Sequence, residues 1–282
     1  MTTDKLEVAP VKSLEDCAKL RRICAKIGGW VHLFHEISLE TGWRTSDVCR
    51  LRFDNINFKT GKTSITVAKQ TRAAQTKAFR TLARKFIAPR LDAPDLTIFE
   101  YRRLTTLKTE AEFKTVLTDT EFALCQEAAS KAKVKPDSKT LSANTVKMIE
   151  RLREKDSGEE YVFARQFTEA RNRKDLDGHI SRQAVWKRFK QIGEMLENDG
   201  VTFTPGYGFS AYSLRKTYIY RVYANAKAKG KDGLSTARDA VGHSDIAVTK
   251  RYVMLDYDEA QEISAELFKQ TGKTMLNAAL AA

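Results

Sequence analysis

The feature that most limits the fold of this chain is the helical spacing of its apolar residues. One set near the N-terminus consists of Leu14, Cys17, Leu20, Cys24 and Ile27. A second set consists of Val185, Phe189, Ile192 and Leu196. A recurrence every three to four residues places apolar side chains on one face of an α-helix. The sequence therefore predicts a mainly helical protein whose core forms where such faces meet.

Capping residues and glycines mark where the helices begin and end. Ser13 is a suitable N-cap for the first helix, which Gly28 and Gly29 would end. A second helix is expected over residues 30–40, and a third after Thr45 or Ser46, with Val48, Cys49 and Leu51 turned inward. Further helices are expected over residues 120–133, 144–154 and 181–197, and from Tyr212, Leu234, Ser244 and Asp258 onward.

Strand signals are few. After Gly61, residues 63–68 form an alternating pattern rich in β-branched side chains, as in an edge strand or a hairpin arm. Short extended pieces are expected near residues 139–141 and 161–163. The predicted fold class is α+β, mainly α-helical, with a small antiparallel sheet. Residues 1–282 are expected to form a single catalytic domain, with an insertion of undecided topology over residues 72–135 and a C-terminal helix or tail over residues 258–282.

The charge balance favours a polyanionic partner. The chain has 49 Lys and Arg against 36 Asp and Glu, a formal net charge of +13, which suits binding to phosphates with release of counterions. The predicted helix over residues 181–197 carries Arg182, Lys187 and Arg188 outside its apolar face. These three residues and Lys216 are the predicted DNA-binding side chains, although a basic helix face can also be merely solvated.

Cysteine and histidine usage does not predict a metal site. Cys17, Cys24, Cys49 and Cys125 form neither a close pair nor a finger pattern, so we expect buried thiols. His32 and His35 stand three apart on a mostly apolar stretch, where packing is the expected role.

No apolar run approaches the roughly 20 residues that span a bilayer, and the N-terminus does not resemble a secretory signal. No membrane partner is expected. The predicted location is the cytoplasm, in association with the nucleoid.

The C-terminal third of the sequence contains an arginine, a histidine and a tyrosine at spacings that could bring their side chains together. Arg215 lies in the segment SLRKT, His243 in GHS, and Tyr252 stands nine residues after His243. If Gly242 ends one helix and Ser244 caps the next, His243 lies at a chain reversal. Phosphodiester exchange needs a nucleophile in line with phosphorus and positive donors for the non-bridging oxygens, and these residues supply both.

With the segment TGWRTSDV, these motifs resemble the boxes of the tyrosine recombinase (phage integrase) family. The resemblance implies that Arg44 and Arg215 bind the scissile phosphate and that His243 contacts it. Tyr252 would be the nucleophile that forms a 3′-phosphotyrosyl bond. Lys69 would donate a proton to the leaving 5′ hydroxyl, with Lys62, Lys77 and Lys139 as alternatives. No cofactor, metal or ATP is implied.

The sequence departs from the family pattern in three places. Asp47 stands where the family usually has Glu, and Tyr212 stands where it usually has His. We expect Tyr212 to donate a hydrogen bond to a non-bridging oxygen, since a phenol is a poor proton acceptor at neutral pH; the alternative is a packed core aromatic. The helical domain that usually precedes the first box is not expected ahead of Thr41.

The predicted function is that of a site-specific recombinase or integrase acting on double-stranded DNA. The resemblance implies a homo-tetramer on DNA, and a separate accessory protein is a further candidate partner. Two alternatives share the motifs: a telomere resolvase or type IB topoisomerase-like enzyme, and a DNA-binding accessory protein that has lost catalysis.

Overall fold

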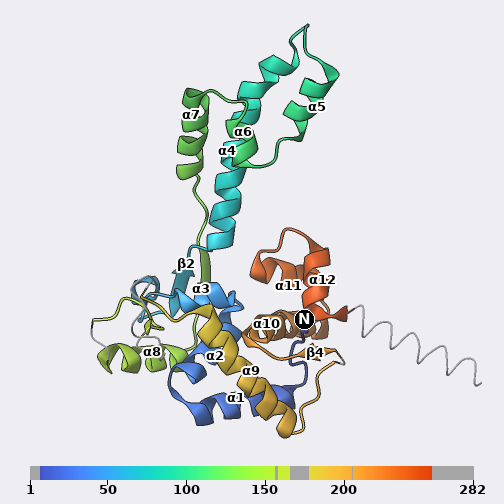
Figure 1. Cartoon of the computed structure of the whole chain (residues 1–282). Coiled ribbons are helices and arrows are strands. Elements are labelled where there is room, and N and C mark those ends of the chain that lie inside the picture. The colour runs from blue at the N-terminus through green and yellow to red at the C-terminus, as the bar shows by residue number, and fades with distance from the viewer. Residues whose placement is uncertain (1–6, 156–157, 166–177, 205, 256–282) are drawn as a thin grey trace, which may run out of the picture. The chain divides into compact units, whose positions relative to one another are not determined.

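The computed structural model describes residues 7–155, 158–165, 178–204 and 206–255 (Figure 1). The chain divides into two compact units. The larger comprises residues Met1–Thr63 and Lys139–Ala282, and the smaller comprises Ser64–Ser138.

The larger unit is a bundle of helices with two very short strands paired at one side. Its helices are α1 (Leu14–Ile27), α2 (Gly29–Thr41), α3 (Thr45–Cys49), α8 (Ala143–Lys155), α9 (Arg182–Asn198), α10 (Ala211–Ala228), α11 (Gly233–Val241) and α12 (Ile246–Val253), with a 3₁₀ turn, η1 (Phe53–Asn55). Strand β1 (Glu7–Val8) pairs in parallel with β4 (Tyr207–Gly208). Helix α10 packs against α2, α11 and α12, so the segments that carry the sequence motifs converge on it.

The core of the larger unit forms where the predicted apolar faces meet. The Phe34 ring of α2 lies 5.2 Å from the Phe163 ring and 5.6 Å from the Phe189 ring of α9, centroid to centroid. The apolar residues predicted to be buried on α9 are all buried. Ser13 caps α1 as predicted, because its side chain accepts a hydrogen bond from the Asp16 amide.

The predicted small antiparallel sheet is formed by β2 (Lys62–Ile65) and β3 (Asp137–Thr140). Its first strand is shorter than expected, because the chain is helical from Ala68 onward. The strong helix formers that follow, mainly Ala, Lys, Gln and Arg, outweigh the strand signal there. The strand predicted at residues 161–163 is not formed; Tyr161 and Ala164 make only isolated bridges.

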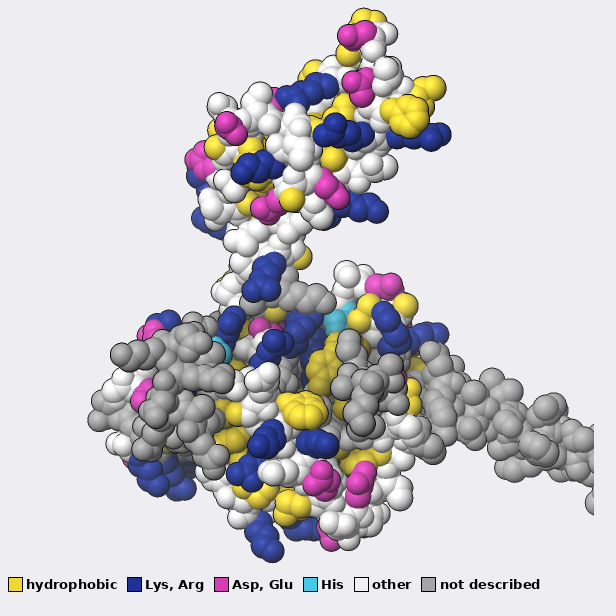
Figure 2. Space-filling view, viewed as in Figure 1, with side chains coloured by type: hydrophobic (Ala, Val, Ile, Leu, Met, Phe, Trp, Pro, Cys, Tyr) yellow, Lys and Arg dark blue, Asp and Glu magenta, His cyan; other side chains and the backbone are white. Residues whose placement is uncertain are grey.

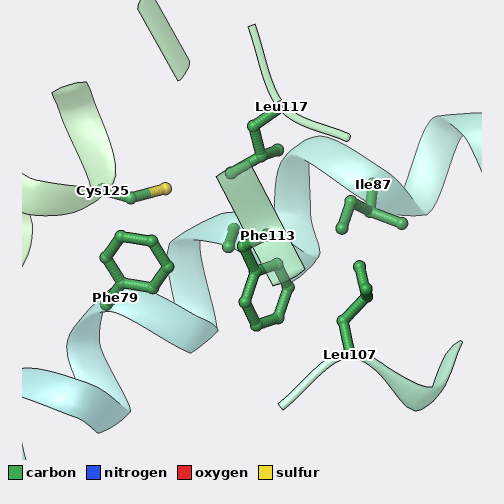
Figure 3. Packing of buried hydrophobic residues seen from close by; sticks show 7 residues of the cluster. Phe79, Ile87, Leu107, Phe113, Leu117 and Cys125 are labelled. Carbon is green, nitrogen blue, oxygen red and sulfur yellow. The ribbon is translucent and has the colours of Figure 1, made fainter. Parts of the chain in front are cut away.

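The smaller unit consists of α4 (Ala68–Leu91), α5 (Ile98–Thr106), α6 (Glu110–Lys114) and α7 (Asp119–Ser130). Figure 1 shows α4 as its long helix, and α7 packs against it. Phe79 and Ile87 of α4 meet Phe113 of α6 and Cys125 of α7 in a core of their own (Figure 3). The sequence indicated only the last of these four helices.

All four cysteines are free and buried, which confirms the prediction of buried thiols. Burial raises the pKa of Cys24 and of Cys49 to about 12. Among the described residues, no helix has both the length and the apolar character needed to cross a membrane. The predicted C-terminal helix or tail over residues 258–282 lies outside the described residues.

Candidate active site

The start of α10 places two candidate residues side by side. The Ser210 hydroxyl accepts a hydrogen bond from the Tyr212 amide at 3.2 Å, and the Ser213 hydroxyl accepts one from the Ser210 amide at 3.2 Å. This reciprocal cap satisfies two amides that the helix leaves unpaired. It fixes the first turn of α10, from which Tyr212 and then Arg215 project.

Arg215 is 3% exposed. One of its terminal nitrogens, Nη1, donates to the Gly42 carbonyl at 2.5 Å, and Nη2 lies 3.2 Å from Nε2 of His243. Burial lowers the pKa of Arg215, and the nearby positive charge of Arg44 lowers it further. Two cations held this close, one of them desolvated, favour an anion between them.

Gly42 connects the first motif to α10. It ends α2 in the left-handed conformation, with φ 65°, and its amide donates to the Ser38 carbonyl. A Cβ atom on Gly42 would lie 2.1 Å from Cδ1 of Tyr218 on α10, so only glycine fits. Two residues later, Arg44 is the extended N-cap of α3. The close approach at Gly42 therefore positions Arg44 as well as Arg215.

His243 lies at the predicted chain reversal between α11 and α12. Gly242 ends α11 with φ 65°, as predicted. The Nδ1 atom of His243 lies 3.0 Å from Oγ1 of Thr249, which is fully buried. Since Nε2 faces Arg215, both ring nitrogens have partners and the ring orientation is fixed. Ser244 does not cap α12; Asp245 does, because it directly precedes the first helical residue and accepts from the Ala247 amide at 2.8 Å.

Tyr252 on α12 lies among these residues. Its ring centroid is 4.9 Å from that of His243, and the Arg215 guanidinium carbon is 5.7 Å from the same ring. The hydroxyl groups of Tyr212 and Tyr252 are hydrogen-bonded to each other. Tyr212 is 38% exposed, so it is not a core aromatic. The pKa of Tyr212 is raised by the partial burial of its phenol and by the hydrogen bond to Tyr252, which keeps it protonated at neutral pH.

The candidate proton donors are placed differently from expectation. Lys69 lies in the first turn of α4 rather than at a strand end, and its side chain lies outside what the structure describes. Lys139 lies in β3, and its ammonium donates to the Ala240 carbonyl at 2.5 Å. Ala240 is in the last turn of α11, just ahead of His243. The extended piece expected near residues 139–141 was the sequence signal for the placement of Lys139 on a strand.

The predicted DNA-binding residues fall into two groups. Arg182, Lys187 and Arg188 are exposed on α9, and Figure 2 shows Lys and Arg side chains across the drawn face of the larger unit, with apolar side chains between them. Lys216 is different, because its ammonium donates to the Val8 carbonyl at 2.6 Å and is half-buried. It joins α10 to β1. Trp186 lies on the same helix as Arg182, Lys187 and Arg188 and is 53% exposed.

The described residues include no group of three or more His, Cys, Asp or Glu side chains placed to hold a metal ion. His35 is buried on α2, with Nδ1 2.9 Å from the neighbouring carboxylate of Glu36. That carboxylate also accepts two hydrogen bonds from Arg21 of α1. This group connects α1 to α2.

The profile of the Phage integrase family matches residues 78–259, more than half of the chain. The match includes Tyr212, Arg215, His243 and Tyr252, whereas Arg44 precedes it. No curated protein matches the sequence.

Solved structures with a similar fold have little sequence in common with this chain. The XerH site-specific recombinase bound to palindromic difH substrate, in a post-cleavage complex, has a TM-score of 0.50 and 12% identity over 93% of this chain and 53% of that one. XerA recombinase has a TM-score of 0.49 and 12% identity over 94% of this chain and 66% of that one. The Tn1549 transposon integrase in complex with transposon right end DNA has a TM-score of 0.48 and 10% identity over 89% and 63%. The chain thus spans between half and two thirds of their lengths.

Proposed function

The chain belongs to the phage integrase family of tyrosine recombinases, and from this membership we propose that it is a site-specific recombinase that cuts and rejoins double-stranded DNA. The observation that carries the proposal is the convergence on one place of Arg215 from α10, His243 from the turn between α11 and α12, and Tyr252 from α12. A cluster of arginine, imidazole and phenol matches the needs of phosphoryl transfer.

In the proposed reaction, the Tyr252 oxygen attacks the scissile phosphorus in line with the 5′ oxygen. The bond from phosphorus to Tyr252 forms while the bond to the 5′ oxygen breaks, which leaves a 3′-phosphotyrosyl group and a 5′ hydroxyl. Rejoining reverses these steps with the 5′ hydroxyl of another strand. The phosphotyrosyl bond retains the energy of the phosphodiester, so neither ATP nor a metal is required.

Arg44 and Arg215 would hold the non-bridging oxygens of the phosphate. Arg215 is well suited because its guanidinium is buried and fixed by Gly42 and His243 before any DNA binds. A donor already in place costs no reorganisation when negative charge develops in the transition state. His243, held at Nδ1 by Thr249, would add a further contact to the phosphate through Nε2, the ring nitrogen that faces Arg215.

Tyr212 would act on Tyr252 directly. Because its pKa is raised, Tyr212 keeps its proton and can donate it in a hydrogen bond to the Tyr252 oxygen. Such a bond favours the charged form of its partner. Tyr212 would thereby stabilise the phenolate that attacks phosphorus, rather than the phosphate as the sequence suggested.

We assign the proton donor for the leaving 5′ oxygen to Lys69, with Lys139 as the competing residue because of its place beside the end of α11. Lys69→Met and Lys139→Met can be compared on a normal substrate and on one with sulfur in place of the bridging 5′ oxygen. A thiolate leaves without protonation, so only the variant that lacks the proton donor should recover its cleavage rate.

The decisive experiment uses a nicked suicide duplex, which traps the covalent intermediate. The wild-type chain should form an adduct that resists SDS, and Tyr252→Phe should form none while binding DNA within a few-fold of wild type. An adduct with the Phe variant would assign the nucleophile to another residue. No adduct from the wild-type chain on any duplex would favour the accessory-protein alternative.

We further propose a homo-tetramer on DNA, since exchange requires two duplexes with two cuts in each. Strand exchange between two labelled duplexes would support this. Relaxation of supercoils or formation of hairpin ends without exchange would favour the topoisomerase-like or telomere-resolvase alternative.

A further inference from the structure

The smaller unit carries a strongly basic helix that the proposed chemistry does not use. Helix α4 has seven Lys and Arg residues and no Asp or Glu. Its apolar residues Phe79, Ala83 and Ile87 are turned into the core of the smaller unit (Figure 3), so the charged residues must occupy its other faces.

Part of this charge gathers on one face. The residues Arg72, Thr76, Lys77, Arg80, Thr81 and Arg84 line one open groove along α4. Arg72, Lys77 and Arg84 are exposed, and Arg80 is half-buried. Residues three or four apart on a helix are neighbours, and like charges at that spacing repel each other. The helix thus carries an unfavourable arrangement of charge that a bound anion would relieve.

Acidic residues of the same unit do not neutralise this face. Arg72, Lys77, Arg80 and Arg84 form no ion pair with any described carboxylate, whereas Arg90 near the end of the helix pairs with Glu121. Several acidic residues are engaged elsewhere: Glu100, Glu112 and Glu121 accept hydrogen bonds from the residues that cap their own helices. The Nε atom of Arg80 has no hydrogen-bond partner.

The dimensions of the face favour a polymer over a small anion. From Arg72 to Arg84 the helix rises about 18 Å, at about 1.5 Å per residue. Duplex DNA presents about one charge per 1.7 Å of its axis, so it can meet all of these cations at once, whereas a single phosphate would meet one or two. Thr76 and Thr81 add hydroxyl groups, which commonly contact phosphate oxygens.

We propose that this face of α4 is a second DNA-contact surface, which binds the phosphate backbone of a duplex independently of its sequence. The surface goes beyond the proposed strand-transfer activity and needs no part of the site around Tyr252.

The test compares two full-length variants that lose the same charge from the same unit. R72Q/R80Q/R84Q removes three cations from the face and leaves Lys77 in place, because Lys77 is a candidate proton donor for the leaving 5′ hydroxyl. R102Q/K108Q/K133Q removes three exposed cations elsewhere in the unit. Gln has nearly the helix propensity of Arg, so α4 should persist; circular dichroism and thermal unfolding check this.

Affinity for a labelled duplex of arbitrary sequence is measured between 50 and 200 mM NaCl. The α4 variant should lose at least tenfold in affinity at 100 mM NaCl. The slope of its plot of log affinity against log salt concentration should become less negative by about 2–3, because each phosphate contact contributes about 0.9 to this slope. The control variant should change by less than threefold. If α4 unfolds in the triple variant, R72Q/R84Q can be used instead, and it should make the slope less negative by about 2.

Equal losses of duplex affinity in the two variants would mean that only net charge matters and would overturn the proposal. An unchanged affinity of the α4 variant would overturn it as well. Weakened binding of single-stranded RNA with unchanged binding of duplex DNA would also overturn it. Adduct formation on the suicide duplex at saturating protein should be unchanged in the α4 variant. A wild-type chain that forms no adduct, while the α4 variant still loses duplex affinity, would remove the recombinase proposal and leave this one standing.

Discussion

At the scale of single residues, the contact between the two phenols distinguishes this site. Tyr212 stands where the family pattern has a histidine, and its hydroxyl is bonded to that of Tyr252. A histidine can exchange a proton near neutral pH, whereas Tyr212 has a raised pKa and remains a donor. In the proposed reaction, the nucleophile Tyr252 is therefore assisted by a hydrogen bond from a neutral phenol.

Tyr212→Phe should slow cleavage by roughly one to two orders of magnitude, the scale for losing one preorganised donor. If Tyr212 acts on Tyr252, the loss should be confined to the cleavage step, with affinity for DNA within a few-fold of wild type. A matching loss of DNA affinity would mean that Tyr212 donates to the phosphate instead. An unchanged rate would remove Tyr212 from the mechanism.

Glu36 gives the chain a predictable response to acid. Burial alone would raise the pKa of Glu36, but hydrogen bonds from His35 and Arg21 outweigh burial and hold it at about 2. A carboxylate with a depressed pKa stabilises the fold fully above its unfolded value of about 4.3, and this stabilisation is lost as the pH falls toward 2.

Glu36→Gln should therefore lower the free energy of unfolding at pH 7 by up to about 3 kcal/mol. It should also flatten the decline of stability between about pH 4.5 and pH 2. Urea unfolding at several pH values measures both effects. Glu15→Gln is the matched control, since Glu15 is an exposed partner of Lys19. If Glu36→Gln retains the wild-type acid dependence, other carboxylates cause it.

At the scale of elements, the site depends on the close packing of the end of α2 against α10. The end of α2 at Gly42 leaves no room for a side chain against Tyr218, and the Gly42 carbonyl accepts the hydrogen bond from Arg215. A substitution there should disturb packing and the site together.

Gly42→Ala should destabilise the protein by about 2–4 kcal/mol, the sum of left-handed strain and overlap with Tyr218. Gly230→Ala is the control, because Gly230 has φ 69° but nothing within 4 Å of an added Cβ; it should cost only about 1 kcal/mol. Urea unfolding measures both variants. Equal costs would show that the contact with Tyr218 contributes nothing. Under conditions in which both variants are folded, the Gly42→Ala variant should also cleave the suicide duplex more slowly than wild type, whereas the Gly230→Ala variant should not.

The elements that could be predicted from the sequence are those whose signal is local. Periodic apolar residues and the caps at Ser13 and Gly242 gave α1, α9 and α11 close to their observed bounds. The smaller unit was less predictable, because α5 and α6 are short, so their periodicity is brief. The β1–β4 pair involves only two residues from each strand, and its register depends on long-range packing that no local pattern encodes.

The candidate site was predictable in part for the same reason. Arg44, Arg215, His243 and Tyr252 stand in contiguous motifs with fixed spacing, so their roles could be proposed from the sequence. The contact between Tyr212 and Tyr252 could not, since it joins residues 40 apart through the packing of α10 on α12. Likewise, the placement of Lys139 at the Ala240 carbonyl depends on the fold.

At the scale of the whole molecule, the proposed chemistry predicts independence from metal ions. Cleavage of a suicide duplex should proceed in EDTA at the rate seen with magnesium, because Arg44 and Arg215 supply the positive charge that a metal would otherwise supply. Single-turnover rates in the two buffers measure this. Strict dependence on magnesium would indicate a metal nuclease, and Tyr252→Phe would then retain cleavage.

The two ends of the smaller unit meet. Ser64 and Ser138 lie on the paired strands β2 and β3, and their hydroxyl oxygens are 2.7 Å apart, although 73 residues separate them in sequence. A segment that leaves and re-enters a fold at neighbouring points can be gained or lost in one genetic event without altering the order of the elements around it. The smaller unit thus has the form of an insertion between two paired strands. If it were removed, a tight turn from β2 to β3 would restore an uninterrupted hairpin.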